Sequence, residues 1–201
     1  MHHVETVGST NDEAVRLASE GAPSGLIVFA DRQTEGRGRL GRSWQSATGN
    51  LQMSILLRPD CRLSAASQLS FLAAVVLADV LTAQGPEGLN LSLKWPNDVL
   101  IDGAKVAGIL LESAGGKDGE LDYVVLGIGL NIAWAPAQMP YPVTSLSAAG
   151  FPPRAPWEWL GDYARSLSIW LDRWQSDGFA VVRTAWRDRS HRLGHSIRLK
   201  T

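Results

Sequence analysis

Two spacings of apolar residues alternate along the chain and predict a mixture of helices and strands. Helical spacing predicts helices over residues 10–18, 65–83, 157–174 and 179–191. Short apolar runs predict strands over residues 26–30, 50–57, 91–94, 99–101, 105–112 and 121–128, and the start of another over 195–200. Strands joined mostly by hairpins, with helices grouped between them, predict an α+β domain with a mixed, largely antiparallel sheet packed by helices.

Local signals place several boundaries of these elements. Thr10 and Glu13 have the spacing of a capping box, which predicts the start of the first helix. Asp102-Gly103 predicts a tight turn between two strands. Thr144 or Ser145 is expected to cap a short helix. The helix over 157–174 is expected to bury one stripe of residues: Trp157, Leu160, Ala164, Leu167, Leu171 and Trp174.

Composition narrows the class of protein. With 201 residues, of which 45% are hydrophobic, the chain can form one sizeable packed domain. A net charge of −1 argues against a general nucleic-acid or membrane binder. The single cysteine, Cys61, suits a reducing cytoplasm. The N-terminus does not resemble a signal peptide, and the apolar stretch near 71–80 is expected to be too short to span a bilayer.

The segment Gly36 to Arg42 alternates glycine with arginine. Glycine lets the backbone approach a ligand and adopt positive φ, and arginine offers a planar fork to carboxylate and phosphate oxygens. The loop could therefore clamp a polyphosphate or an acyl phosphate. A flexible basic surface loop and an RNA-binding arginine–glycine patch remain alternatives. A dinucleotide-binding interpretation is rejected, because no crossover helix or acidic ribose partner follows.

Two further segments carry polar groups beside strands. Lys94 to Asp98 places a cation, an amide and a carboxylate at one strand end, where they could orient a nucleotide or a metal. The alternative is a proline that ends the strand, with Trp95 packed in the core. Lys105 is a candidate to neutralise a carboxylate or α-phosphate, although a lysine near a hairpin tip is usually solvated.

Glycines inside strands suggest close approach of a ligand to the backbone. Gly108 would leave room for a flat ligand, and Gly127 and Gly129 suggest the same on the following strand. Asn131 could recognise a base edge or a ribose, or simply form a turn after a bulge. Ser9 and Thr10 could divide their hydroxyls between helix capping and a polar ligand group.

The order and spacing of these segments, from about Val4 to Leu146, resemble those of biotin–protein ligases. The resemblance implies a fold like that of class II aminoacyl-tRNA synthetases. It implies a catalytic domain over residues 1–191 and the first strand of a small SH3-like barrel over 192–201. No winged helix precedes Val4, so a DNA-binding role is not expected. Gln52 stands where many relatives carry an aromatic residue.

The resemblance also implies an ATP-dependent reaction. The carboxylate of biotin attacks the α-phosphate of ATP and gives biotinyl-5′-AMP and pyrophosphate. A lysine of the biotin carboxyl carrier protein of acetyl-CoA carboxylase then attacks the acyl carbon, and AMP leaves. Mg²⁺ is expected on the phosphates with Asp98 nearby, and Lys105, Arg37 and Arg39 are expected to take part in catalysis.

Two sets of binding residues follow from the same resemblance. The set expected to bind biotin is Ser9, Thr10, Asn11, Gln33, Arg37, Gly38, Arg39, Lys105, Gly108, Leu110, Gly127 and Gly129. The set expected to bind ATP or the adenylate is Arg39, Arg42, Trp44, Lys94, Asn97 and Asn131.

Two other functions stay open at this stage. A lipoate–protein ligase or lipoyl transferase would share the acyl-adenylate chemistry, and a nucleic-acid-binding module would use the arginine–glycine loop. The expected setting is the cytoplasm, without DNA or membrane, and a homodimer is an open option.

Overall fold

The computed structural model describes residues 1–192 and 194. In that part of the chain, one seven-stranded sheet has the strand order β1-β2-β3-β7-β6-β5-β4. The strands are β1 (His2–Val7), β2 (Ile27–Gln33), β3 (Leu51–Leu57), β4 (Leu91–Lys94), β5 (Asp98–Ile101), β6 (Ala104–Gly115) and β7 (Leu121–Leu130). The α-helices are α1 (Thr10–Ser19), α2 (Gln68–Gln84), α3 (Pro156–Asp177) and α4 (Phe179–Asp188).

The pairing of strands confirms the mixed, largely antiparallel sheet. β1 runs parallel to β2, and every other neighbouring pair is antiparallel. β1 itself was not predicted, because its sequence His2–Val7 is mostly polar and has no apolar run. Asp102 and Gly103 both have positive φ, which is the conformation of a type I′ hairpin turn, so that predicted turn is confirmed.

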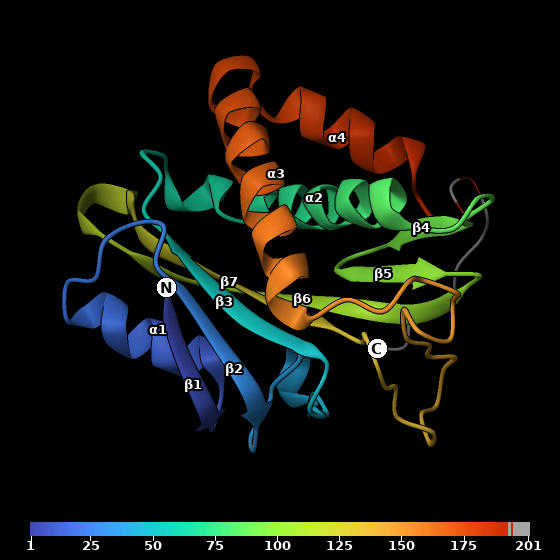
Figure 1. Cartoon of the computed structure of the whole chain (residues 1–201). Coiled ribbons are helices and arrows are strands. Elements are labelled where there is room, and N and C mark those ends of the chain that lie inside the picture. The colour runs from blue at the N-terminus through green and yellow to red at the C-terminus, as the bar shows by residue number, and fades with distance from the viewer. Residues whose placement is uncertain (193, 195–201) are drawn as a thin grey trace.

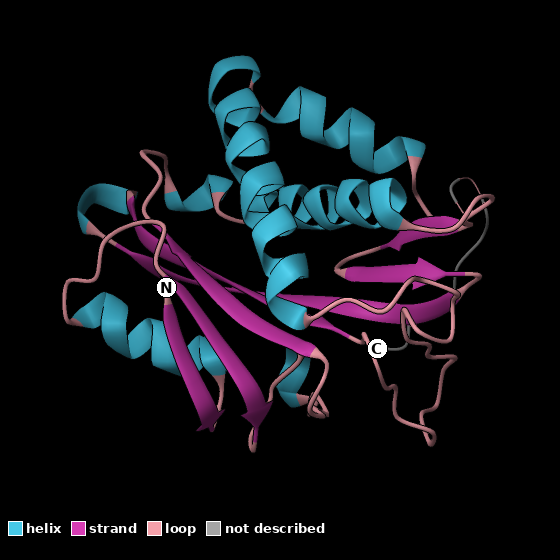
Figure 2. Ribbon diagram, in the orientation of Figure 1, coloured by secondary structure: helices cyan, strands magenta, loops and turns pink. Residues whose placement is uncertain are grey.

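Helices cover the two faces of the sheet unequally (Figure 1). α2, α3 and α4 lie over one face and bury the main core, which includes Met53 of β3. α1 lies on the other face, where Ala14 packs in a smaller cluster with Leu56. Because α1 has only ten residues, it covers only part of its face. Loops and turns connect the strands beyond α1 (Figure 2). The cleft described below is lined by residues of α1 and of such loops.

The apolar composition of α2 follows from its place between other elements. α2 contacts four strands of the sheet on one side and α3 and α4 on the other. By length and composition the stretch Leu63–Gln84 could cross a membrane, so the expectation that the chain has no stretch long enough is wrong. Here that stretch is a core helix, which passes the same test.

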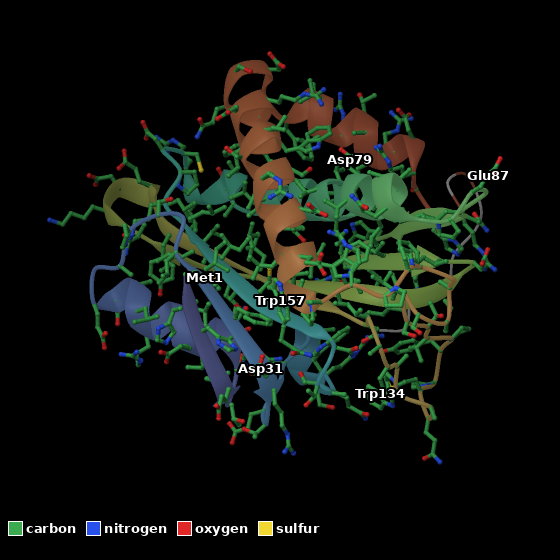
Figure 3. The ribbon with its side chains drawn as sticks, in the orientation of Figure 1. Met1, Asp31, Asp79, Glu87, Trp134 and Trp157 are labelled. Carbon is green, nitrogen blue, oxygen red and sulfur yellow. The ribbon has the colours of Figure 1, made fainter. Side chains whose placement is uncertain are left out.

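Three local predictions are wrong, for identifiable reasons. No side chain caps α1, because the Thr10 hydroxyl bonds to Gln33 instead. Residues 146–150 form turns rather than a helix. In the stripe predicted on α3, Leu160, Leu167 and Trp174 are buried as expected, but Trp157 is 63% exposed at the start of the helix (Figure 3). The strand predicted over 195–200 lies outside the described residues.

Candidate active site

A cleft of about 370 Å³ opens on the α1 side of the sheet. Seventeen residues chosen from the sequence line it: Ser9, Thr10, Asn11, Gln33, Arg37, Gly38, Arg39, Arg42, Trp44, Lys94, Asn97, Asp98, Lys105, Gly108, Leu110, Gly127 and Gly129. They come from α1 and its N-cap, from five strands, and from the loops that precede β3 and β5. The fold therefore gathers into one cavity segments that are far apart in the chain.

At one end of the cleft, the start of α1 contributes a network of uncharged hydrogen-bonding side chains, bordered by the ion pair of Arg37 and Glu112. The backbone N–H and the hydroxyl of Thr10 both donate to Oε1 of Gln33, at 2.8 and 3.0 Å. Ser54 Oγ lies 2.8 Å from Thr10 Oγ1 and 2.6 Å from Asn11 Oδ1. The Asn11 amide donates to Glu112 at 2.6 Å. These bonds fix the orientation of each polar group before any ligand arrives.

The hydroxyl of Ser9 differs from its neighbours. Ser9 occupies the N-cap position of α1, yet its side chain makes no capping bond and no other hydrogen bond to the described residues. Because Ser9 also lines the cleft, its hydroxyl is free to bond a polar ligand group. We expected the hydroxyl of either Ser9 or Thr10 to cap α1, and in the structure neither hydroxyl does so.

Arg37 is held at this same end of the cleft. Its guanidinium pairs with Asp12 and lies 3.1 Å from Oε1 of Glu112. Arg37 and Lys105 line the same cleft, and each is paired with a carboxylate of the protein. Their expected joint binding of a carboxylate and an α-phosphate stays a prediction.

The other end of the cleft is cationic, and Lys105 is at its centre. Its Nζ pairs with Asp98 Oδ1 at 2.5 Å, and the side chain is 15% exposed. The aromatic rings of Trp44 and Tyr141 have centroids 5.5 and 5.8 Å from the same Nζ. A desolvated ammonium group is stabilised by such contacts, so Lys105 is fixed in position in the ligand-free site.

Positive charge dominates the lining. Asp98 is the one acidic side chain among the described lining residues, and it already neutralises Lys105. The cations that line the cleft are Arg37, Arg39, Arg42, Lys94 and Lys105. Within the described chain, Arg39, Arg42 and Lys94 make no ion pair. The cleft can therefore attract an anion with several negative oxygens.

Gly108 and Gly129 are register partners on β6 and β7, and they form the floor between the two ends. The indole of Trp44 lies on this floor: a Cβ on Gly129 would overlap its ring, and one on Gly108 would lie 3.2 Å from Cζ3. A Cβ on Gly127 would overlap the Asn11 side chain. These glycines therefore make room for the protein's own side chains in this structure.

The arginine–glycine loop, Gly36 to Arg42, is closed by backbone hydrogen bonds between its two ends. Trp44 N donates to Gly36 O at 2.7 Å, and Gly38 N donates to Arg42 O at 2.6 Å. Positive φ occurs at Leu40 and Gly41, at the tip, and not at Gly36 or Gly38. Gly36 is needed for another reason, because a Cβ there would lie 2.5 Å from the carbonyl oxygen of Trp44.

The two asparagines expected to bind the adenylate both donate hydrogen bonds to backbone carbonyl groups of the protein. The Asn97 amide donates to Ile109 O at 2.6 Å, although Asn97 still lines the cleft. Asn131 does not line the cleft: it is 2% exposed, and its amide donates to Thr144 O at 3.1 Å. Its predicted contact with a nucleotide therefore has no support from this placement.

Sequence reasoning missed several residues near the site. Ser54 and Tyr141 carried no motif of their own, and only the pairing of strands and the path of a loop bring them here. Trp95, which only the alternative interpretation of its segment packed in the core, is 58% exposed and lines the cleft. Gln52 is 1% exposed and lies outside the lining, and neither atom of its amide has a partner among the described residues.

Known proteins are similar to this chain in sequence and in fold. The model of the biotin/lipoate A/B protein ligase family matches residues 4–131. A biotin–[acetyl-CoA-carboxylase] ligase of Paracoccus denitrificans is 42% identical over 198 residues, which cover 96% of this chain and 82% of that protein.

Two solved structures have the same fold. Biotin protein ligase from Leishmania major, in complex with biotinyl-5-AMP, superposes with a TM-score of 0.81 at 25% identity, covering 100% of this chain and 85% of that one. Biotin protein ligase from Aquifex aeolicus, in complex with biotin and ATP, gives 0.78 at 30% identity, covering 96% and 78%. This chain therefore belongs to the biotin/lipoate A/B protein ligase family.

Proposed function

We propose that this chain is an ATP-dependent biotin–protein ligase. The observation that carries the proposal is a single cleft with a neutral hydrogen-bonding end, a glycine floor and a cationic end. Biotin has a matching shape: a neutral ureido group, an apolar body and a carboxylate. The relatives named as biotin ligases, and the solved neighbours that hold biotin, ATP or biotinyl-AMP, support the same activity.

The neutral end is suited to the ureido ring. A ureido group presents one carbonyl acceptor and two N–H donors, so it needs both kinds of partner. The free hydroxyl of Ser9 can supply either, and the Thr10–Gln33 pair is already oriented. Buried polar groups with fixed partners discriminate strongly against ligands that leave them unsatisfied. We therefore assign selectivity for biotin to this end.

The cationic end is suited to the first chemical step. A carboxylate oxygen of biotin attacks the α-phosphorus of ATP, and the bond to the bridging oxygen of pyrophosphate breaks. Two anions must meet, so cations must be fixed where negative charge accumulates. Lys105 supplies the central charge, with Arg39 and Arg42 toward the opening. The substrate anions compete with Asp98 for the Lys105 ammonium group.

Magnesium is best placed on the phosphates of ATP. The described residues contain no cluster of three or more histidine, cysteine, aspartate or glutamate side chains able to hold a metal. Asp98 is the one lining carboxylate, and it is paired with Lys105. This donor set does not form a metal site by itself. It is compatible with the usual Mg²⁺ arrangement of one or two carboxylates plus substrate phosphates.

In the second step, the amine of a carrier lysine attacks the acyl carbon, and AMP leaves. We propose the biotin carboxyl carrier protein as the acceptor, because the Paracoccus relative is named for acetyl-CoA carboxylase. The need for ATP and the single Cys61 favour a reducing cytoplasm. The homodimer, the lack of DNA binding and the division at residue 191 stay predictions.

A lipoate–protein ligase is the competing function, because the matching family contains both kinds of ligase. Incubation of the protein with ATP, a carrier domain and either labelled biotin or labelled lipoate separates them. We expect transfer of biotin to the carrier and none of lipoate. Transfer of lipoate without biotin would overturn the proposal. The hydrogen-bonding end favours biotin, since lipoate has no ureido group to bond the hydroxyl of Ser9.

A further inference from the structure

Tyr141 lies in the cleft but outside the residues that the family model matches, which end at 131. It comes from a proline-rich loop, between Pro140 and Pro142. The flanking prolines restrict the backbone on both sides of the ring. Because no motif covers this segment, the role of Tyr141 must be derived from its contacts.

The backbone of this loop is bonded directly to Lys105. Lys105 N donates to Pro142 O at 2.9 Å, and Thr144 N donates to Lys105 O at 2.9 Å. The amide of Asn131 in turn donates to Thr144 O. Both backbone groups of Lys105 are therefore satisfied by the segment that carries Tyr141. Any movement of the loop moves the lysine, and the buried Asn131 fixes the loop.

Side-chain geometry adds a second link between the two residues. The Tyr141 ring centroid lies 5.8 Å from Nζ of Lys105, within the range of a cation–π interaction. Burial, followed by the nearby Asp98 carboxylate, raises the pKa of Tyr141, while Arg42 lowers it. The phenol therefore stays neutral at physiological pH. The ring is a permanent, uncharged support for the ammonium group.

The other two partners of the ammonium group are replaceable. A substrate carboxylate or phosphate would compete with Asp98 for the N–H donors of Lys105, and Trp44 lies on the floor that a flat ligand would occupy. We propose that Tyr141 is a positioning residue that keeps the Lys105 ammonium group aimed into the cleft when Asp98 and Trp44 give way. This inference rests on the proposed ligase function for the reaction that Lys105 serves.

The first test compares adenylate formation in three variants under single-turnover conditions. Tyr141→Leu removes the ring and should slow adenylate formation about tenfold, with the dissociation constant for biotin unchanged. Tyr141→Phe keeps the ring and should restore the rate to within about threefold. Tyr123→Leu is the matched control, because its half-buried ring stacks on Arg58, away from the cleft, and its rate should stay at the wild-type value.

Two outcomes would overturn the positioning role. Equal losses in Tyr141→Phe and Tyr141→Leu would mean that the hydroxyl, not the ring, matters. A Tyr141→Leu variant with the wild-type rate would mean that Lys105 needs no such support.

The second test needs no substrate, so its outcome is independent of the proposed ligase function. The chain has four lysines, and reductive methylation with a carbon-13 label gives each a methyl signal in NMR spectra. The loss of one signal in Lys105→Arg assigns that residue. Ring currents from Trp44 and Tyr141 should shift it upfield of the exposed Lys117.

The shift should persist in Tyr141→Phe and shrink in Tyr141→Leu. An unshifted Lys105 signal, or one that Tyr141→Leu leaves unchanged, would overturn the inference. A shifted signal in a protein that forms no adenylate would instead overturn the proposed function alone.

Discussion

The indole of Trp44 lies against the bare backbone of Gly129, in the space that a Cβ would need. The glycine was expected to make room for biotin, and the structure fills that room with the protein's own tryptophan. The two findings agree if biotin displaces the indole when it binds and then occupies the same space above Gly129. The consequences can be measured on each of the two residues.

Gly129→Ala should weaken the fold as well as the site. The added methyl group overlaps the Trp44 ring, so the ring or the strand must shift. Such overpacking typically lowers the free energy of unfolding by about 1–3 kcal/mol. Urea unfolding measures this change, and calorimetry measures the expected loss of biotin binding.

Gly161→Ala is the control for that substitution. Gly161 lies in α3, its φ is not positive, and the nearest atom to an added Cβ is Arg165 Nη1 at 3.6 Å. Replacing a helical glycine with alanine should raise stability by about 0.5–1 kcal/mol. If Gly129→Ala were as stable as Gly161→Ala, the close packing of Trp44 on the floor would be contradicted.

Trp44→Ala should separate binding of biotin from retention of the adenylate. Without the indole, biotin displaces nothing from the floor, so its dissociation constant should stay within about threefold of wild type or decrease. Release of biotinyl-AMP should become faster, because the ring no longer helps to cover it. Calorimetry and a filter-binding release assay measure the two quantities. A loss of biotin affinity of tenfold or more, with the fold intact, would rule out displacement.

Lys105→Ala and Arg39→Ala should fail at different steps. Removing a fixed cation from the site of developing charge typically slows a reaction by about 10²–10³-fold, so Lys105→Ala should slow adenylate formation by this factor. Arg39 lies exposed at the opening, so Arg39→Ala should release biotinyl-AMP early and label nearby lysines unselectively. Lys117→Ala, in an exposed turn, is the control. Unchanged formation and retention of the adenylate in both site variants would contradict these roles.

His191 should make stability depend on pH at mildly acid values. Its pKa is lowered from 6.5 by burial, then by Arg192 and Lys94. Below about pH 6.5 the unfolded chain binds a proton that the folded protein binds less readily, so stability falls as pH decreases. His191→Gln should remove this part of the loss. Urea unfolding at pH 7 and pH 5 tests it, and identical pH dependence in both proteins would refute it.

The sequence predicted most elements because their signals are local. β4 was predicted at its observed bounds, and the turn at Asp102-Gly103 has the expected backbone conformation. β1 could not be predicted, because an edge strand of polar residues has no apolar pattern and is held by its pairing with β2. Trp157 was misplaced because it has the same spacing as the buried Leu160 but lies in the first turn of α3, where spacing alone does not show whether the core still covers it.

In the candidate site too, individual residues could be predicted from the sequence, but their contacts with one another could not. The resemblance to biotin–protein ligases identified seventeen of the lining residues, and some of them, such as Lys105 and Gly108, were also notable for their type and place in the sequence. The pairing of Arg37 with Glu112, and of Lys105 with Asp98, could not be read, since it depends on which strands are neighbours. Tyr141 was missed because a loop residue acquires its neighbours only from the path of the folded chain.

The most direct measurement is a single-turnover reaction with ATP radiolabelled on its α-phosphate, given biotin or lipoate in turn. We expect biotin to give labelled biotinyl-5′-AMP and lipoate to give no labelled adenylate. In Lys105→Ala, biotinyl-5′-AMP should form far more slowly. A lipoyl adenylate without a biotinyl adenylate, or no acyl adenylate from either acid, would contradict the central claim.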